Sequence, residues 1–149
     1  MNNLDNDGLD PFKSTKLFGL NIYFKTLKKL YENKKLPNVI LLEGEKGQGK
    51  FTLSFHLINY ILSKNAEINY NIESLEINKK SNLYKSIMSN TQENFFYLEN
   101  EKNKTSIEDV RNIKKKLSKT LLNNLPRFII FDDVELLNLN AANALLKLI

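Results

Sequence analysis

The first half of the chain alternates between helical and strand-like patterns of apolar residues. The segment Asn21–Lys34 is predicted to be a helix, because apolar residues recur along one face at Leu20, Phe24, Leu27 and Tyr31. The run Val39–Leu42 is short, continuous and apolar, which predicts a buried strand of a parallel sheet. Helical spacing returns after Lys50 and predicts a helix that ends between Ser63 and Asn65, with its apolar stripe at Leu53, Leu57, Tyr60 and Ile61.

The second half of the chain repeats this alternation. The aromatic run Phe95–Leu98 predicts another strand, and the wholly apolar run Phe128–Phe131 predicts a third. Between them, Ser106 is a candidate N-cap for a helix whose apolar stripe is Ile107, Val110, Ile113 and Leu117. The aromatic rings could instead stack on nucleic-acid bases, but no glycine or basic residue is interleaved with them, which favours a place in the core.

Three other stretches have weaker patterns. Residues 1–11 are polar and predict a flexible N-terminal tail. Residues 67–92 are polar, rich in asparagine and weakly periodic, which predicts an irregular insertion with a short helix near Leu83–Met88. The run Lys114–Lys116 occupies consecutive positions, so its side chains point around the predicted helix rather than along one face. Such runs are usually solvated, and contact with a DNA phosphate backbone is the alternative.

Composition narrows the possible functions. The 149 residues suit one domain, and 42% hydrophobic with 26% charged residues is typical of a globular protein. The chain has no cysteine and a single histidine, His56, which exclude a thiolate or histidine metal cluster and a Ser-His-Asp triad. We expect His56 to be an ordinary helix side chain. The net charge of +5 permits nucleic acid as a partner without demonstrating it.

No apolar run reaches the roughly 18 to 20 residues that a membrane-spanning helix needs. The N-terminal residues are polar and acidic, unlike a secretory signal. We therefore expect a cytoplasmic protein with no membrane partner.

The turn after Val39–Leu42 carries the clearest chemical signal. Gly44, Gly49 and Lys50 match the pattern G-x-x-x-x-G-K in the order strand, glycine-rich turn, lysine, helix, which is typical of a phosphate-binding P-loop. Glycine easily adopts the backbone angles that aim several N–H groups at a phosphate, and the helix adds its positive N-terminal end. We expect these residues to bind nucleotide phosphates: Gly44, Gly47, Gln48, Gly49, Lys50, Phe51 and Thr52. The alternative is a plain strand-to-helix turn with a solvated lysine.

The strand Phe128–Phe131 ends in Asp132 and Asp133. Four apolar residues followed by acidic ones form the Walker B pattern, in which a buried strand presents a carboxylate to a nucleotide. Mg²⁺ prefers oxygen ligands and bridges to phosphates, so Asp132 is the predicted ligand of a magnesium ion bound with ATP. Together the two motifs predict an α/β fold of the P-loop NTPase type, a parallel sheet flanked by helices.

The residues after Walker B resemble a particular family. The stretch Ala141-Ala142-Asn143-Ala144-Leu145-Leu146-Lys147 is similar to the corresponding segment of bacterial clamp-loader AAA+ subunits. Leu17-Phe18-Gly19, Lys35-Leu36-Pro37-Asn38 and the order Lys50, Phe51, Thr52 resemble the delta-prime subunits of DNA polymerase III, as does the segment Ile107–Leu117. The resemblance runs from about Phe12 to the last residue and is poor over 67–92, so we expect residues 12–149 to form a partial AAA+ nucleotide-binding domain.

The resemblance implies a function in DNA replication. Such a subunit helps a clamp-loader complex to place a sliding clamp on primed DNA, with gamma/tau and delta subunits as partners. By the same resemblance Lys50 would hold the terminal phosphates of ATP, Thr52 the α-phosphate side, and Asp132 the magnesium ion. Delta-prime subunits often act as structural members of the complex and do not hydrolyse ATP themselves.

Two departures from the family pattern bear on hydrolysis. Phe51 stands where a hydroxyl usually binds Mg²⁺, and Asp133, the candidate catalytic residue, stands where active members carry a glutamate that orients water. Both favour a binding-only site. The alternatives are an active gamma/tau-like motor subunit and a small-molecule P-loop kinase. The segment Asn138–Lys147 argues against the kinase.

The family also has a sensor 1 strand between the P-loop strand and the Walker B strand, and its sequence would follow Ile149. Without that strand a sheet of this kind has open edges and exposed apolar surface. We therefore expect this chain to be a fragment of a longer gene product, truncated before the sensor 1 strand.

Overall fold

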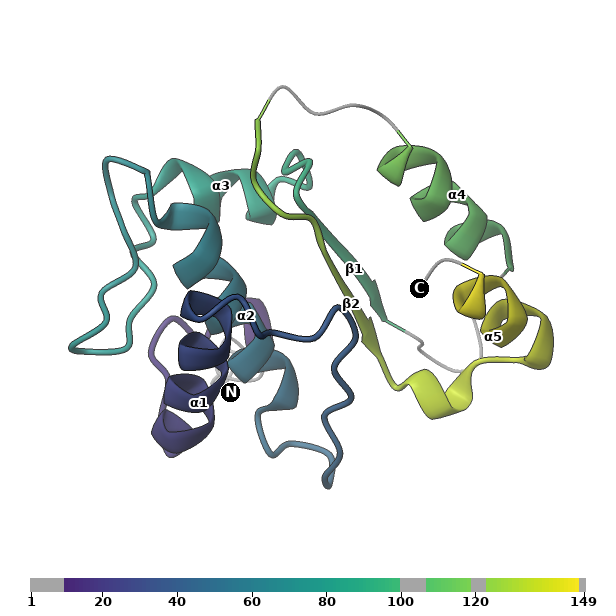
Figure 1. The fold of residues 1–149 in the computed structure, drawn as a ribbon, viewed down its shortest axis with the longest axis horizontal. Helices are drawn as coiled ribbons and strands as arrows, with labels where there is room; N and C mark the ends of the chain where they lie inside the picture. Colours follow the sequence, from purple (N-terminus) through teal and green to yellow (C-terminus); the bar gives the residue numbers. More distant parts are fainter. Residues whose placement is uncertain (1–9, 100–106, 119–122, 148–149) are drawn as a thin grey trace, which may run out of the picture. The chain divides into compact units, whose positions relative to one another are not determined.

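The computed structural model describes residues 10–99, 107–118 and 123–147. The chain divides into two compact units, residues 1–91 and residues 92–149 (Figure 1).

The first unit contains helices η2 (Pro11–Lys13), α1 (Asn21–Glu32), α2 (Lys50–Ser63) and α3 (Asn82–Met88). The predicted helices at 21–34, 50–63 and 83–88 are confirmed, each within a few residues at its ends. Helix α1 stops at Glu32, because Asn33 is its C-cap and Lys34 has a positive φ of 56°. Residues 1–9 of the predicted tail lie outside the described residues, whereas Asp10 caps η2 by accepting from the Phe12 N–H at 3.0 Å.

Helix α2 is the centre of the first unit. Eleven of its 14 residues are buried, far more than the predicted stripe of four. It packs against α1, where the fully buried Phe24 lies edge-on to Tyr60 with ring centroids 6.1 Å apart. Phe24 also stacks on Tyr70 at 5.4 Å, and the Tyr60 and Tyr70 rings lie edge-on at 6.2 Å, so the three rings form one cluster. A helix that is apolar around most of its circumference needs this kind of enclosure.

Residues 67–92 contribute to that core. Apart from α3 the segment has no regular helix or strand, but its backbone pairs with the chain before α1 through Leu17 N–H to Leu75 O (3.0 Å) and Ile77 N–H to Thr15 O (2.7 Å). Helix α3 is capped by Ser81, whose hydroxyl accepts from the Tyr84 N–H at 3.1 Å. The segment buries five apolar side chains: Tyr70, Leu75, Ile77, Tyr84 and Ile87.

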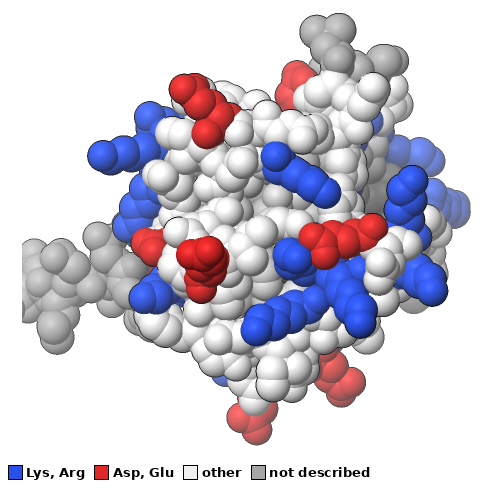
Figure 2. Space-filling view, turned by 60° about the vertical axis from the view of Figure 1, so that its left-hand side comes forward, with Lys and Arg blue, Asp and Glu red and all other residues white. Residues whose placement is uncertain are grey.

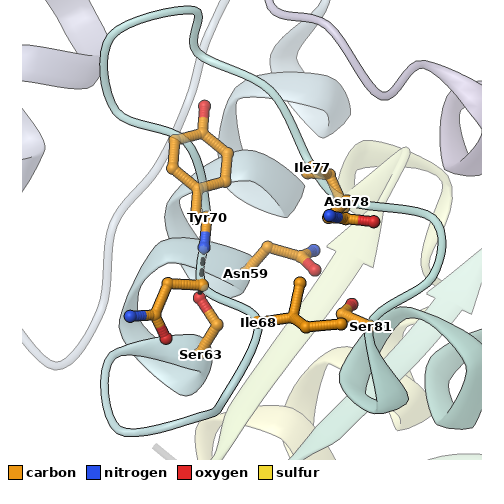
Figure 3. A pocket seen from close by; sticks show the side chains of 8 residues that line it. Asn59, Ser63, Ile68, Tyr70, Ile77, Asn78 and Ser81 are labelled. Carbon is orange, nitrogen blue, oxygen red and sulfur yellow. Dashed lines mark hydrogen bonds between the residues drawn. The ribbon is translucent and has the colours of Figure 1, made fainter.

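A small cavity lies between α2 and this segment (Figure 3). Its volume is about 10 Å³, which is roughly the space that one water molecule needs. The lining is mostly polar, and the Tyr70 N–H donates to the Ser63 hydroxyl at 2.9 Å on one side of it. The cavity is therefore a place for structural water and is far too small for a nucleotide.

The predicted strand Val39–Leu42 is not formed. Residues 35–45 have no helix or strand assignment, and Val39, Ile40 and Leu41 are 55%, 40% and 75% exposed. A parallel strand is stable only when neighbouring strands satisfy its N–H and C=O groups. Among the described residues the sheet consists of two other strands only, so nothing pairs with this run. The prediction of a buried strand before the glycine loop is wrong for this structure.

The second unit contains β1 (Phe95–Glu99), α4 (Ile107–Leu117), β2 (Phe128–Asp132), η4 (Val134–Leu136) and α5 (Leu139–Leu146). Strands β1 and β2 are parallel, in a register that places Phe95 opposite Phe128 and Glu99 opposite Asp132. Both strands were predicted, and so was α4, which packs against α5 (Figure 1). The predicted cap Ser106 lies outside the described residues. The mixed helix and strand content fits an α/β fold.

Asn94 fixes the register of the two strands. It is 2% exposed, and its side-chain amide donates to the carbonyl oxygens of Leu125 (3.1 Å) and Pro126 (3.2 Å). It also exchanges hydrogen bonds with the Asn123 amide, and its own carbonyl accepts from the Phe128 N–H at 2.8 Å. A buried amide that is satisfied in this way holds the start of β1 against the loop that leads into β2.

The described helices include none that is long and apolar enough to cross a membrane. The described residues also include no group of three or more His, Asp or Glu side chains that could hold a metal ion.

His56 is buried inside the first unit and makes two hydrogen bonds. Its Nε2 lies 2.9 Å from the Ser14 carbonyl oxygen, which can only accept, so Nε2 carries the proton. Nδ1 then accepts from the Tyr70 hydroxyl at 2.8 Å. Burial lowers the pKa of His56, and the bond to Ser14 opposes this effect. This helix side chain therefore joins three segments of the chain in its neutral form.

We expect the free energy of unfolding to fall as the pH falls below about 6.5, the pKa of an unfolded histidine. The folded state resists protonation because its pKa is lowered, so the unfolded state binds the extra proton. The loss approaches about 1.4 kcal/mol per pH unit between the unfolded and folded pKa values. Denaturant titrations from pH 8 to pH 5 measure it. His56 is the only histidine, so His56→Gln should flatten the curve in this range; an unchanged curve would contradict the assignment.

Candidate functional site

The glycine loop Gly44–Gly49 leads directly into α2. Gly49 is the N-cap of this helix and has left-handed backbone angles, φ 79° and ψ 22°. A Cβ atom there would lie 3.0 Å from a methyl carbon of Leu20, so a side chain would meet both backbone strain and a close neighbour. Gly44 and Gly47 also have positive φ values, 153° and 87°. The loop therefore depends on glycine at the positions that the sequence pattern singled out.

The loop presents backbone donors at the start of α2. The amide N–H groups of Gly47, Gly49 and Lys50 have no backbone acceptor among the described residues. Unpaired N–H groups and the positive end of a helix dipole together form a site suited to an anion. This arrangement suits a phosphate group, and a full positive charge lies beside it in the first turn of the helix.

That charge is on Lys50. Its ammonium group donates to two carbonyl oxygens of the loop, Gly44 O at 2.7 Å and Glu45 O at 2.9 Å. The side chain therefore folds back over the loop. The Gln48 side chain also lies against the loop. Its Oε1 is so close to Gly44 that it would clash with a Cβ atom there. An incoming phosphate would exchange the lysine's carbonyl contacts for contacts with its own oxygens.

Phe51 points away from the loop into the core. It is 8% exposed, and its ring lies edge-on to Phe12 with centroids 4.7 Å apart and stacked on Phe55 at 5.7 Å. Its side chain therefore anchors the first turn of α2, and a role in binding nucleotide is left to its backbone. Thr52 is half-buried and carries the first hydroxyl after Lys50. This hydroxyl group makes no hydrogen bond to a described residue.

The carboxylate of Asp132 stands at the end of β2. Its Oδ1 accepts from the Asp133 N–H at 3.1 Å, and its Oδ2 accepts from the Tyr97 hydroxyl on β1 at 3.4 Å. Asp132 is half-buried, and its hard oxygen atoms are of the kind that Mg²⁺ takes. Asp133 has left-handed angles (φ 48°, ψ 47°) and is the N-cap of η4. The predicted residues of the loop lie in the first unit, and the two aspartates lie in the second.

A groove between α4 and α5 carries positive charge. Its volume is about 340 Å³, and three cationic side chains and two amides line it with two small apolar residues: Arg111, Lys114, Lys147, Asn140, Asn143, Val110 and Ala144. Of the predicted lysine run only Lys114 lines this groove, while the Lys116 ammonium lies over the Phe96 ring at 5.9 Å. The run therefore points around α4, as its consecutive positions predicted. Elsewhere basic and acidic side chains are interspersed, as on the face shown in Figure 2.

Comparison with known proteins identifies the family. The family described as "DNA polymerase III, delta subunit" matches residues 19–149, which is most of the chain. The chain belongs to this family. It is a DNA polymerase III clamp-loader-type subunit. The match includes the glycine loop, both strands of the sheet and α5.

A curated relative is of a different kind. The dynein heavy chain-like protein 2 of Plasmodium falciparum (isolate 3D7) is 31% identical over 97 residues, which is 62% of this chain. The chain spans 2% of that relative's length, so the similarity brings no function to it.

Two residues of the second unit were missed as contributors to the site. Tyr97 was predicted only as part of an aromatic strand, and Asn94 was not singled out. The signal for Tyr97 was available in principle, because it is the one residue of its strand with a hydroxyl, but only the register of the sheet relates it to Asp132.

We expect Phe51→Ser, which restores a hydroxyl after the P-loop lysine, to destabilise the first unit by about 3 kcal/mol or more, because it empties an aromatic site in the core. Chemical denaturation measures the loss. The matched control is Phe18→Ser: Phe18 is 73% exposed and has the Lys16 ammonium over its ring, so its loss should cost less than about 1 kcal/mol. Equal losses would show that Phe51 does not anchor α2.

Proposed function

We propose that this chain is a delta-prime-type subunit of a clamp loader and that it binds ATP through its glycine loop without efficient hydrolysis. Its partners would be the gamma/tau and delta subunits and, through the complex, the sliding clamp and primed DNA. The observation that carries the nucleotide part is the loop itself. Among the described residues its Gly47, Gly49 and Lys50 amides have no backbone acceptor, and they lie at the start of the buried helix α2.

Lys50 and Asp132 are the charged residues that we propose for ATP and its magnesium ion. Lys50 would pass from the carbonyl oxygens of Gly44 and Glu45 to the terminal phosphates, and Thr52 would lie on the α-phosphate side. Asp132 would hold the magnesium ion. The support for Asp132 is its oxygen chemistry, its place at the end of β2 and the family's Walker B pattern. Bound Mg-ATP would supply a cation that neutralises phosphate charge.

Weak or absent hydrolysis is supported by two side chains. The Phe51 ring is committed to the core, so the position after the lysine gives no hydroxyl to a metal ion. Asp133 is shorter than the usual glutamate, and its left-handed backbone is used to start η4. The rival proposal is an active gamma/tau-like motor. ATP turnover near the ordinary enzymatic range of about 1 s⁻¹ or faster would favour that rival.

The groove between α4 and α5 is our candidate for contact with primed DNA. Its cations come from both helices, and guanidinium, ammonium and carboxamide groups all donate to phosphate oxygens.

We expect Mg-ATP at 100 times its Kd to raise the free energy of unfolding by about 2.7 kcal/mol, which is several degrees in the thermal midpoint. Lys50→Ala should abolish this shift because it removes the charge that faces the terminal phosphates. Lys46→Ala, which removes an exposed charge from the same loop, should leave most of it. No shift in a chain that unfolds cooperatively would refute ATP binding, and equal shifts in both variants would refute the role of Lys50.

We expect Lys114→Ala to weaken binding to a primed DNA duplex and to reduce the slope of log K against log salt by about 0.9, the value for one lost phosphate contact. Fluorescence anisotropy over a salt series measures the slope, with the subunit assembled in its complex. Lys115→Ala is the control, because Lys115 is exposed on the same helix but does not line the groove. Equal slopes for the two variants would exclude the groove as the contact.

A further inference from the structure

Helix α1 and the residues that follow it hold most of the excess positive charge of the chain. Residues 21–35 include five lysines and one acidic residue, Glu32, an excess of four, whereas the whole chain has a net charge of +5. Lys25, Lys28, Lys29 and Glu32 are spaced at i, i+3, i+4 and i+7, so they share one face of the helix. This face runs for about 10 Å along α1.

Three further lysines lie at the end of α1 and the end of α2. The backbone N–H groups of Lys34 and Lys35 donate to carbonyl oxygens in the last turns of α1, which holds both residues there. Lys64 is the C-cap of α2, and it is close enough to Glu32 for its charge to act on that carboxylate. We call this set of six the lysine face: Lys25, Lys28, Lys29, Lys34, Lys35 and Lys64.

The one carboxylate on α1 is held by internal partners. Glu32 accepts from the Tyr60 hydroxyl at 2.7 Å and from the Lys28 ammonium at 3.0 Å. The Lys28 hydrogen bond lowers the pKa of Glu32 most, and the Tyr60 bond lowers it further. The other five lysines of the face are exposed and form no ion pair within the described residues. Their charge is therefore left for a partner to neutralise.

The kind of cation indicates the kind of partner. Every cation of the lysine face is an ammonium group, which acts as a point charge, whereas recognition of carboxylates favours the planar fork of arginine. Lysine is also depleted at protein–protein interfaces. A helix that lies on a membrane needs an exposed apolar face, but α1 buries Phe24 against α2. A phosphate backbone, with one charge per roughly 1.7 Å of duplex axis, fits a row of ammonium groups.

We propose that the lysine face binds the phosphate backbone of double-stranded nucleic acid without reading its base sequence. Contacts to phosphate position a duplex and carry no sequence information. This surface lies in the first unit, so it is distinct from the groove between α4 and α5, and the inference needs neither that groove nor the ATP site. Leu20 approaches Gly49 at the start of α1 and α2, whereas Tyr60 meets Glu32 near their ends, so the end of the lysine face lies away from the glycine loop.

The test uses the whole chain and the double variant Lys25→Gln, Lys29→Gln. Binding to a duplex DNA is followed by fluorescence anisotropy over a salt series. We expect the slope of log K against log salt to become shallower by about 1.8, which is about 0.9 for each lost phosphate contact. The matched control is Lys79→Gln, Lys80→Gln, which removes two exposed charges from the same unit outside the lysine face and should leave the slope unchanged. The thermal midpoint of each variant checks its fold.

A second variant predicts a change of opposite sign. Glu32→Gln removes the carboxylate and releases Lys28, while the new amide oxygen can still accept from the Tyr60 hydroxyl. We expect tighter binding to the same duplex, with the slope steeper by about 0.9 for one added phosphate contact. Two duplexes of equal length and unrelated sequence should bind equally well.

The outcomes that overturn the inference differ from those that bear on the proposed function. Equal slopes for the lysine-face variant and its control would exclude this surface as a contact. If Lys114→Ala alone made the slope shallower, the groove would be the contact, and the proposed function would stand without the lysine face. Binding to vesicles that contain phosphatidylglycerol, with none to DNA, would assign the lysine face to an anionic lipid surface instead.

Discussion

Eleven of the 14 residues of α2 are buried, and the geometry of the first unit depends on this enclosure. The helix is held by aromatic contacts to α1 and to Tyr70, and at its first turn by the cluster of Phe12, Phe51 and Phe55. Because the glycine loop ends at the N-cap of the same helix, burial of α2 also fixes the amides that the loop presents. The loop thus has a rigid base although its own residues are mostly exposed.

The same enclosure bears on chemistry at the loop. A position that often supplies a hydroxyl for magnesium is here occupied by a phenyl ring, and the ring strengthens the core next to the amides of the glycine loop. The side chain at position 51 can either pack in the core or offer a hydroxyl to a metal ion. In this structure it packs in the core. A subunit that binds nucleotide and does not need to turn it over can tolerate this exchange, which is why Phe51 supports a binding-only site.

In the second unit the corresponding constraint is the register of two short parallel strands. Asn94 secures it at one end through buried hydrogen bonds, and Tyr97 and Asp132 meet near the other. A pair of strands is marginal without further support, so each polar contact that fixes the register contributes substantially to where Asp132 stands. The carboxylate is therefore positioned by residues about 35 positions away in sequence.

The sequence by itself determined helices α1 to α4, the strands β1 and β2, the glycine positions of the loop and the family, because these follow from periodicity and short motifs. It failed at Val39–Leu42, where an apolar run predicts a strand only if partners are present to pair with it, and pairing is a property of the tertiary structure. It also could not show that Phe51 turns into the core, that residues 67–92 enclose α2, or that Tyr97 reaches Asp132. Each of these depends on contacts between segments distant in sequence, which local patterns do not encode.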